Sequence, residues 1–287
     1  MSDLLNVQIR REDNGDITLH QEPYIVSMMD RFLPEGPPAA IQANTTPTTA
    51  DLAQHVADAA LADPAYDTDL SKRYSSLVGS LIYAATQTRP DIAYAVSMLS
   101  RVLAKATPAL MTAAERVLVY LYRHRHVGLR YSATPSDPDA FSDSNWDVRR
   151  STSGWLIRWQ QAAIFFGAKA QKSVALSSAE AEIVALSEAA KDCVYFQAFC
   201  DEVDPPAHRP LSLACDNQAA RDLAYNPEHH ERTKHVARRH FYIRQVVEDH
   251  AIRVPFVRSH ENLADFFTKH LAPKNFFALR KVIMNVL

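Results

Sequence analysis

The stretch that decides the fold is SSAEAEIVALSEAAKDCVYF, residues 177–196. Its first two serines are good helix N-caps, and the Ala, Glu and Leu residues that follow favour a helix. On a helical wheel, Glu182 falls on the apolar face, together with Ala185, Leu186, Ala189, Cys193 and Phe196. Glu180, Ser187 and Lys191 fall on the opposite face, which we expect to be exposed to solvent.

The inward position of Glu182 has two interpretations. The ordinary one is a glutamate at the edge of the apolar face, which is the commoner case for an arbitrary helix. The other is a carboxylate that neutralises a buried partner such as a metal ion, because an unpaired charge inside a protein is costly. The rest of the chain decides between them.

The bulk composition describes a globular chain with a substantial core. A length of 287 residues suggests one large domain or two ordinary ones, and a hydrophobic content of 47% is normal. The net charge of −2 argues against a globally basic nucleic-acid-binding protein but permits a local basic face. With six glycines and no glycine-rich phosphate motif, a phosphate-binding loop is not expected.

The three cysteines form no CxxC pair, and their odd number argues against a disulfide framework. We therefore expect reduced thiols and an intracellular location, cytoplasmic or nuclear. No apolar run approaches the length of a membrane span, so no membrane partner is expected. The first twenty residues are too polar for a signal peptide.

The first half of the chain predicts a hairpin followed by helices. Asn14-Gly15 separates two alternating runs, which is a hairpin signal, and a short helix is expected over residues 24–32. Residues 34–66 are rich in Pro, Ala and Thr and are interpreted as a connector. Amphipathic runs then predict helices over residues 70–87, 91–106 and 110–125.

The second half predicts a mixed sheet flanked by helices, because strands precede and then alternate with helical runs. The expected strands are residues 129–133, 140–146, 151–159, 162–170, 211–217 and 252–259. Besides the helix that carries Glu182, the expected helices are residues 218–226, 233–250 and 261–271.

Four acids stand where chemistry collects in such sheets. Asp143 and Asp216 close predicted strands, Glu182 lies on the inward helix face, and Asp265 lies in the first turn of the last helix. Together they form an oxygen ligand set suited to Mg²⁺ or Mn²⁺, and without cations they would repel one another. Two such ions would suit phosphodiester hydrolysis.

Each acid also has a purely structural interpretation. Asp143 could be a turn residue, and Asp216 or Asn217 could cap the following helix. Asn262 and Asp265 have the spacing of a capping box. Taken together in one sheet order, the four are better explained by a shared metal site.

Residues 229–244, HHERTKHVARRHFYIR, supply a basic segment. It is either a solvated charged helix or a surface that contacts nucleic-acid phosphates, and we favour the second. The histidines are poor zinc candidates, because no cysteine accompanies them and their spacing fits no standard zinc pattern.

Specific motifs then point to a family. FSDSNW, RRSTSGW, ALSSAEAEIVAL, CDNQAA, NPEHHERTKHVARRHF and LADFFTKHL, in this order, resemble the ribonuclease H domain of Ty1/copia-type retrotransposon polyproteins. The upstream YSSLVGSLIYAATQTRPDIAYAVSMLSR and RVLVYLYRHRHVGLRYS resemble the reverse transcriptase end of the same polyproteins. The resemblance covers nearly the whole chain and is weakest over residues 34–66.

The resemblance implies an α/β, ribonuclease H-like mixed five-stranded sheet flanked by helices, preceded by a small, mostly helical thumb/connection-like subdomain. The expected divisions are a polymerase palm remnant (1–33), a linker (34–69), the helical subdomain (70–127) and a ribonuclease H domain with a C-terminal helix (128–287). The polymerase Tyr-x-Asp-Asp motif does not occur, so no DNA synthesis by this chain alone is expected.

The implied activity is cleavage of the RNA strand of RNA–DNA hybrids with two Mg²⁺ (or Mn²⁺) ions. The implied catalytic and metal-binding residues are Asp143, Glu182, Asp216 and Asp265. The expected nucleic-acid-binding residues are Ser144, Asn217, Arg232, Lys234, His235, Arg238 and Arg239. His260 is a possible proton shuttle. The expected partners are the hybrid and the rest of a retroelement polyprotein, with the oligomeric state left open.

Two alternatives remain. The chain could be a catalytically silent fragment that only binds nucleic acid. It could also be an integrase- or transposase-type nuclease, but those sites usually use three acids ending in a helical Glu, whereas here the helical Glu comes second and an Asp comes last.

Overall fold

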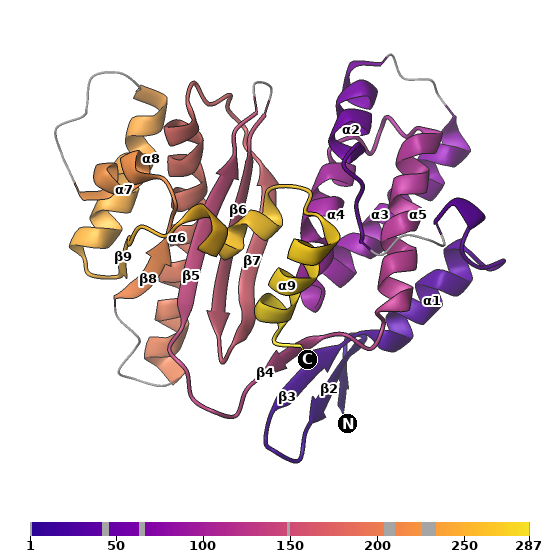
Figure 1. Ribbon diagram of the computed structural model, residues 1–287, viewed down its shortest axis with the longest axis horizontal. Coiled ribbons are helices and arrows are strands. Elements are labelled where there is room, and N and C mark those ends of the chain that lie inside the picture. The colour runs from indigo at the N-terminus through magenta and orange to yellow at the C-terminus, as the bar shows by residue number, and fades with distance from the viewer. Residues whose placement is uncertain are drawn as a thin grey trace. The chain divides into compact units, whose positions relative to one another are not determined.

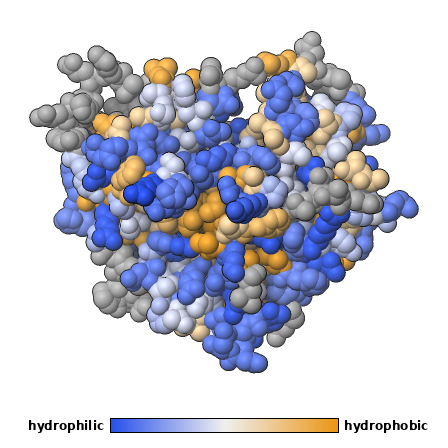
Figure 2. All heavy atoms as spheres, viewed as in Figure 1, coloured by the Kyte–Doolittle hydropathy of each residue, from blue (hydrophilic) through white to orange (hydrophobic). Residues whose placement is uncertain are grey.

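The computed structural model describes most of the chain and divides it into two compact units. The first unit is Met1–Ala133 with His270–Leu287, and the second is Thr134–Lys269. The described residues are 2–41, 46–62, 67–147, 150–203, 210–225 and 234–286. Within them, no helix is both long enough and apolar enough to span a membrane. Hydrophilic residues cover most of the face drawn in Figure 2, because most large apolar side chains are in the cores.

The first unit begins with an antiparallel sheet in the order β1-β2-β3-β4 (Figure 1). Its strands are β1 (Ser2–Leu4), β2 (Val7–Arg11), β3 (Ile17–His20) and β4 (Leu129–Tyr131). The hairpin expected at Asn14-Gly15 is confirmed, and Gly15 takes the left-handed φ of 88° that this turn requires.

Helices complete the first unit. They are α1 (Glu22–Phe32), α2 (Leu52–Leu61), α3 (Thr68–Gln87), α4 (Ala93–Ser100), α5 (Pro108–Arg123) and α9 (Pro273–Met284), with 3₁₀ turns η1 (Ala39–Ile41) and η2 (Pro90–Ile92). The expected connector over residues 34–66 thus contains a real helix, α2, which buries Leu52, Val56 and Ala59. Pro90 opens η2 rather than one continuous helix to residue 106, and α4 ends at Ser100.

The second unit is built on a five-stranded mixed sheet in the order β7-β6-β5-β8-β9. The strands are β5 (Asp139–Asn145), β6 (Thr152–Trp159), β7 (Ala162–Ala170), β8 (Leu211–Ala214) and β9 (Ile252–Arg253). β5, β6 and β7 are antiparallel, whereas β8 runs parallel to β5 and to β9. The predicted fold class, an α/β mixed five-stranded sheet flanked by helices, is confirmed.

The helical elements of this unit are α6 (Ser178–Val203), α7 (Gln218–Tyr225), α8 (Lys234–Glu248), η3 (Ser259–Glu261) and η4 (Leu263–Phe267). α6 packs against β5, β6 and α8, and its residues Leu186, Cys193 and Phe196 lie in the apolar core with Leu213 of β8. η4 packs on β5 and β6 and crosses in front of them in Figure 1. All three cysteines are buried, and none of them is part of a disulfide.

The structure divides the chain differently from the expected ranges. β4, expected to begin the ribonuclease H domain, pairs with β3 of the first unit, and α9 also belongs to that unit. Asn285, just after α9, donates from its Nδ2 to the Arg130 carbonyl oxygen of β4 at 2.9 Å, and Arg280 Nη1 donates to the Tyr120 hydroxyl at 3.0 Å. These polar contacts and packing hold the C-terminal helix to the first unit.

Two residues of α6 contradict the expected solvent face. Glu180 and Ser187 are buried, because α6 is covered by other elements along this part of its length. Lys191 is exposed, as expected. The last predicted strand is also shorter than expected: β9 stops at Arg253, and Pro255 two residues on cannot donate to a sheet ladder.

Candidate metal centre

Three of the four candidate acids converge. Asp143, Glu182 and Asp216 each offer a carboxylate oxygen, and these oxygens all lie within 4.8 Å of one another. Asp143 and Glu182 are buried, with 5% and 6% of their surface exposed, and Asp216 is half-buried. Three acids from a strand, a helix and a strand end thus form one oxygen-rich group, which we name the acid cluster.

The sheet register explains why Asp143 and Asp216 meet. In the parallel pair, Asp139 stands beside Ser212 and Phe141 beside Ala214, and the same offset joins Asp143 to Asp216. β5 continues to Asn145, so Asp143 lies within the strand and not at its end as expected, but the pairing with β8 has finished before it. Asp143 and Asp216 therefore both lie just beyond the paired residues of the two strands.

Glu182 reaches the cluster from the first turns of α6, and the Ser144 backbone N–H donates to its Oε1 at 3.2 Å. Its Oε2 is buried and has no hydrogen-bond partner among the described residues. Burial, reinforced by the charges of Asp143 and Asp216, raises the pKa of Glu182 to about 9. A buried carboxylate oxygen without a donor beside two further carboxylates fits a divalent cation.

Asp143 is also a buried carboxylate whose pKa is raised. Burial raises its pKa to about 7, aided by the charges of Asp265 and Asp216, and a hydrogen bond from the Thr268 hydroxyl opposes this rise. Unpaired ionised carboxylates in such a site would cost several kcal/mol, so the cluster must hold either protons or cations near neutral pH.

Asp265 is not in the group of mutually close oxygens. It lies on the 3₁₀ turn η4, not on the expected helix, and its Oδ2 pairs with Lys269 Nζ at 2.7 Å. Its charge nevertheless acts on Asp143, as the pKa of that residue shows. The fourth acid therefore stands beside the cluster and is already neutralised.

Two asparagines make the helix caps that the sequence also allowed for Asp216 and Asp265, so the carboxylates of these acids are not used as caps. Asn217, not Asp216, caps α7: its Oδ1 accepts from the Ala220 backbone N–H at 3.0 Å. Asn262 caps η4 by accepting from the Ala264 N–H at 3.1 Å, and its Nδ2 donates to the Ser142 carbonyl at 3.0 Å. Asn262 thereby ties η4 to β5.

The expected nucleic-acid-binding residues are only partly described. Arg232, and the side chains of Lys234 and His235, lie outside the described residues. Arg238 is exposed, and Arg239 lines a pocket of about 280 Å³ whose other cationic residues are Lys169, Lys172 and Lys191. His260 on η3 is 71% exposed and its Nε2 lies 3.7 Å from Glu261.

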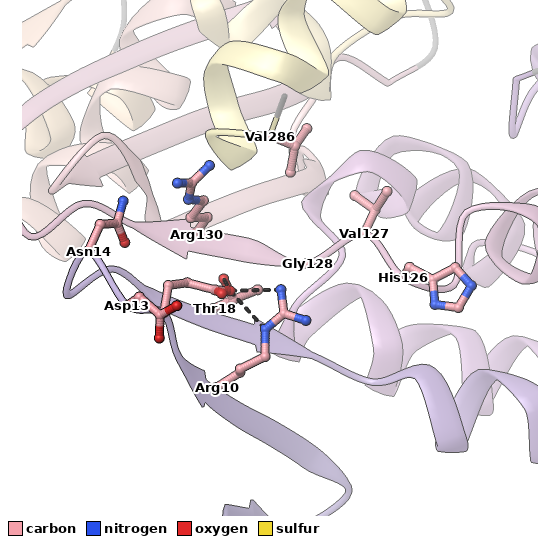
Figure 3. Close-up of a pocket in the computed structure, with 10 residues that line it drawn as sticks. Arg10, Asp13, Asn14, Thr18, His126, Val127, Gly128, Arg130 and Val286 are labelled. Carbon is pink, nitrogen blue, oxygen red and sulfur yellow. Dashed lines mark hydrogen bonds and ion pairs between the residues drawn. The ribbon is translucent and has the colours of Figure 1, made fainter. Parts of the chain in front are cut away.

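A larger pocket of about 590 Å³ lies in the first unit (Figure 3). Its two arginines are paired with acids: Arg10 pairs with Glu12 at 2.7 Å, and Arg130 pairs with Asp16 at 2.7 Å. Because these partners satisfy its arginines, this pocket is a weaker candidate site than the acid cluster.

Two residues beside the acid cluster, Thr268 and Lys269, are not among the residues predicted from the sequence, although both lie in the motif LADFFTKHL. Asp265 and Lys269 stand four residues apart, the spacing of a helical ion pair, and that signal could have found the lysine. No sequence signal shows that the Thr268 hydroxyl contacts Asp143.

The raised pKa values predict how cation-free stability depends on pH. The pKa of Glu182 is raised from 4.5 to about 9, so the folded chain holds a proton that the unfolded chain releases in this window. Stability from this proton is complete below pH 4.5 and is lost as the pH rises toward 9. In EDTA, the temperature of the unfolding midpoint should decrease as the pH is raised from about 7 to about 9. This range lies above the ordinary histidine pKa of about 6.5, so titration of ordinary histidines does not contribute to the decrease.

Differential scanning calorimetry across this range tests the prediction, with Glu182→Gln as the comparison. The glutamine variant should show a flatter profile, and saturating Mg²⁺ should flatten that of the wild type. Parallel profiles for wild type and variant in EDTA would contradict it.

Gly154 sets how closely η4 approaches the sheet. It stands opposite Asp143 in the β5–β6 register, and an added Cβ would meet Thr268 Cγ2 at 2.5 Å and the Ala264 carbonyl oxygen at 3.0 Å. Gly154→Ala should therefore lower the free energy of unfolding by about 1–3 kcal/mol, the usual scale of overpacking. Urea denaturation measures this.

Gly79 of α3 provides the matched control, because nothing lies within 4 Å of its added Cβ. Gly79→Ala should raise stability by up to about 1 kcal/mol, since alanine favours a helix. Equal effects of the two substitutions would show that the approach of η4 is not limited by Gly154.

Comparison with known proteins gives the family. No family model matches the chain. The retrovirus-related Pol polyprotein from transposon TNT 1-94 of Nicotiana tabacum is 33% identical over 97% of the chain, and that from transposon RE1 of Arabidopsis thaliana is 36% identical over 69%. The matched regions are 21% and 14% of those polyproteins, so the chain spans about a fifth or less of their length.

A solved structure, RNase H1 from Halobacterium salinarum NRC-1, is similar to 46% of this chain over 95% of its own, with 15% identity and a TM-score of 0.34. The chain therefore belongs to the retrovirus-related Pol polyproteins of copia-type transposons.

Proposed function

We propose that the second unit is a metal-dependent endonuclease that hydrolyses the RNA strand of RNA–DNA hybrids. The observation that carries this proposal is the convergence of Asp143, Glu182 and Asp216 with a buried oxygen of Glu182 left without a donor. Two further observations support it: the family to which the chain belongs, and the cationic residues around Arg239.

In this proposal the acid cluster holds divalent cations, Mg²⁺ or Mn²⁺, and Asp265 supplies a fourth carboxylate. When bound, two such cations would activate the attacking water and stabilise charge on the leaving oxygen. The Ser144 N–H orients Glu182, and the Thr268 hydroxyl orients Asp143, so both carboxylates are held before a cation arrives.

Selection of hybrids would depend on contacts outside the cluster. Arg238 and Arg239 are suited to phosphate contacts, which position a duplex without reading its sequence. Discrimination of RNA from DNA requires contacts to 2′-hydroxyls in the wide minor groove. Ser144 and Asn217 remain predicted contacts of this kind, and the oxygen of the Asn217 side chain is already engaged as a helix cap.

The test is cleavage of an end-labelled RNA–DNA hybrid by the purified chain, with Mg²⁺, Mn²⁺ or EDTA, beside RNA and DNA duplexes of the same sequence. We expect cleavage of the hybrid's RNA strand with either cation and none in EDTA. An intact hybrid would overturn the proposal. Binding without cleavage, unchanged by Asp216→Asn, would indicate the silent binding module, and strand transfer of a DNA end would indicate an integrase-type nuclease.

A further inference from the structure

The ion pair between Asp265 and Lys269 stands beside the acid cluster. The two charged atoms are 2.7 Å apart, and the side chains are 16% and 46% exposed. Both act on the cluster: the charge of Asp265 raises the pKa of Asp143, and that of Lys269 lowers it. The lysine therefore supplies positive charge where the proposed function places a cation.

The neighbouring residue fixes this arrangement. Thr268 is fully buried and its hydroxyl donates to Asp143, while its backbone N–H donates to the Asp265 carbonyl at 3.3 Å. Thr268 can approach β6 this closely because Gly154 has no side chain. Thr268 and Lys269 are consecutive in the chain, and each contacts one of the four acids. Thr268 contacts Asp143, and Lys269 contacts Asp265.

We propose that Lys269 is an internal counter-ion that keeps Asp265 out of the acid cluster until cations bind, so that Asp265 becomes a ligand only when Lys269 is displaced. The inference rests on the proposed function, because it assumes that the cluster binds divalent cations. It assigns Lys269 a positioning role that acts through Asp265.

Two consequences follow from charge alone. In the cation-free chain Lys269 neutralises one of four neighbouring acids, and its removal leaves their repulsion unopposed. In the loaded chain the ammonium group competes with the cation for Asp265 and repels it. Removing the positive charge should therefore weaken the cation-free fold and tighten cation binding.

The chain contains a closely matched control. Lys191 Nζ pairs with Glu188 at 2.9 Å, and those side chains are 54% and 18% exposed. The pair has nearly the same geometry and exposure as Lys269 with Asp265, but Glu188 is not a member of the acid cluster. Lys191→Gln thus removes an ion pair of similar geometry away from the candidate ligands, and Glu188 keeps a second lysine, Lys169, at 3.6 Å.

The experiment titrates Mg²⁺ and Mn²⁺ into the full chain by calorimetry and follows the thermal midpoint with and without cation. Lys269→Gln and Lys269→Met should each lower the cation dissociation constant about fivefold, the scale of an exposed ion pair. Both should lower the midpoint in EDTA and enlarge the shift that Mg²⁺ produces. Lys269→Arg and Lys191→Gln should stay within about twofold of the wild type in affinity.

Unchanged or weaker cation binding by the two neutral variants, or an equal effect of Lys191→Gln, would overturn the inference while leaving the proposed function intact. A wild-type chain that binds no cation would overturn both. A chain that binds cations and responds to Lys269→Gln as expected, but does not cleave the hybrid, would support the counter-ion and refute the nuclease.

Discussion

Glu182→Gln is expected to lower the rate of hybrid cleavage by at least about 10³-fold. The substitution keeps the size of the side chain but removes the negative charge at the buried end of the acid cluster. Cation binding supplies several kcal/mol of transition-state stabilisation in such sites, and each 1.36 kcal/mol is about tenfold in rate. The single-turnover rate at saturating Mg²⁺ measures the loss.

Glu180→Gln is the control for this substitution. Glu180 lies two residues earlier on the same helix and has the same 6% exposure as Glu182. Its Oε2 accepts from the Leu176 backbone N–H at 2.8 Å, and a glutamine oxygen can accept that bond as well. Cleavage by this variant should stay within about twofold of the wild type. Equal losses from both variants would mean that burial of a charge on α6, not membership of the cluster, controls activity.

The helical wheel and the motif order could predict Glu182, because an amphipathic helix places one face inward whatever its partners are. The same wheel was wrong about Glu180 and Ser187, because it cannot show that other elements also cover the remaining face of α6. Asp143 and Asp216 were predictable as neighbours from strand order alone, since parallel strands share an edge.

The state of Asp265 was not predictable in the same way. The four-residue spacing suggests its pairing with Lys269. Its approach to the cluster, however, depends on the turn adopted by residues 263–267 and on Gly154, which is 111 residues earlier in the chain. β4 shows the same limit in the fold: a three-residue strand has too little pattern to specify its partner, and it joins the first unit. Short elements take their place from tertiary contacts that local sequence does not encode.

The motif TRPDIAY contains the feature with the largest expected effect on stability. Arg89 and Asp91 are fully buried and form a bidentate pair, with Nε–Oδ1 and Nη2–Oδ2 distances of 2.9 and 2.8 Å. The Tyr120 hydroxyl donates to Asp91 Oδ2 at 2.6 Å, and Arg280 of α9 donates to that hydroxyl. The pair thus links η2, α5 and α9 in the core of the first unit.

Asp91→Asn should lower the free energy of unfolding of the first unit by about 3–5 kcal/mol, because it leaves the Arg89 guanidinium buried without its counter-charge. At about 2–4 °C per kcal/mol for a chain of this size, the thermal midpoint should fall by roughly 10 °C. Glu115→Gln is the control in the same unit: Glu115 pairs with Arg73 at 3.0 Å, but that arginine is 52% exposed, so the loss should stay below about 1 kcal/mol. Calorimetry measures the unfolding midpoint of both variants. Similar small decreases in the two midpoints would show that the buried Arg89–Asp91 pair stabilises the fold no more than an exposed ion pair does.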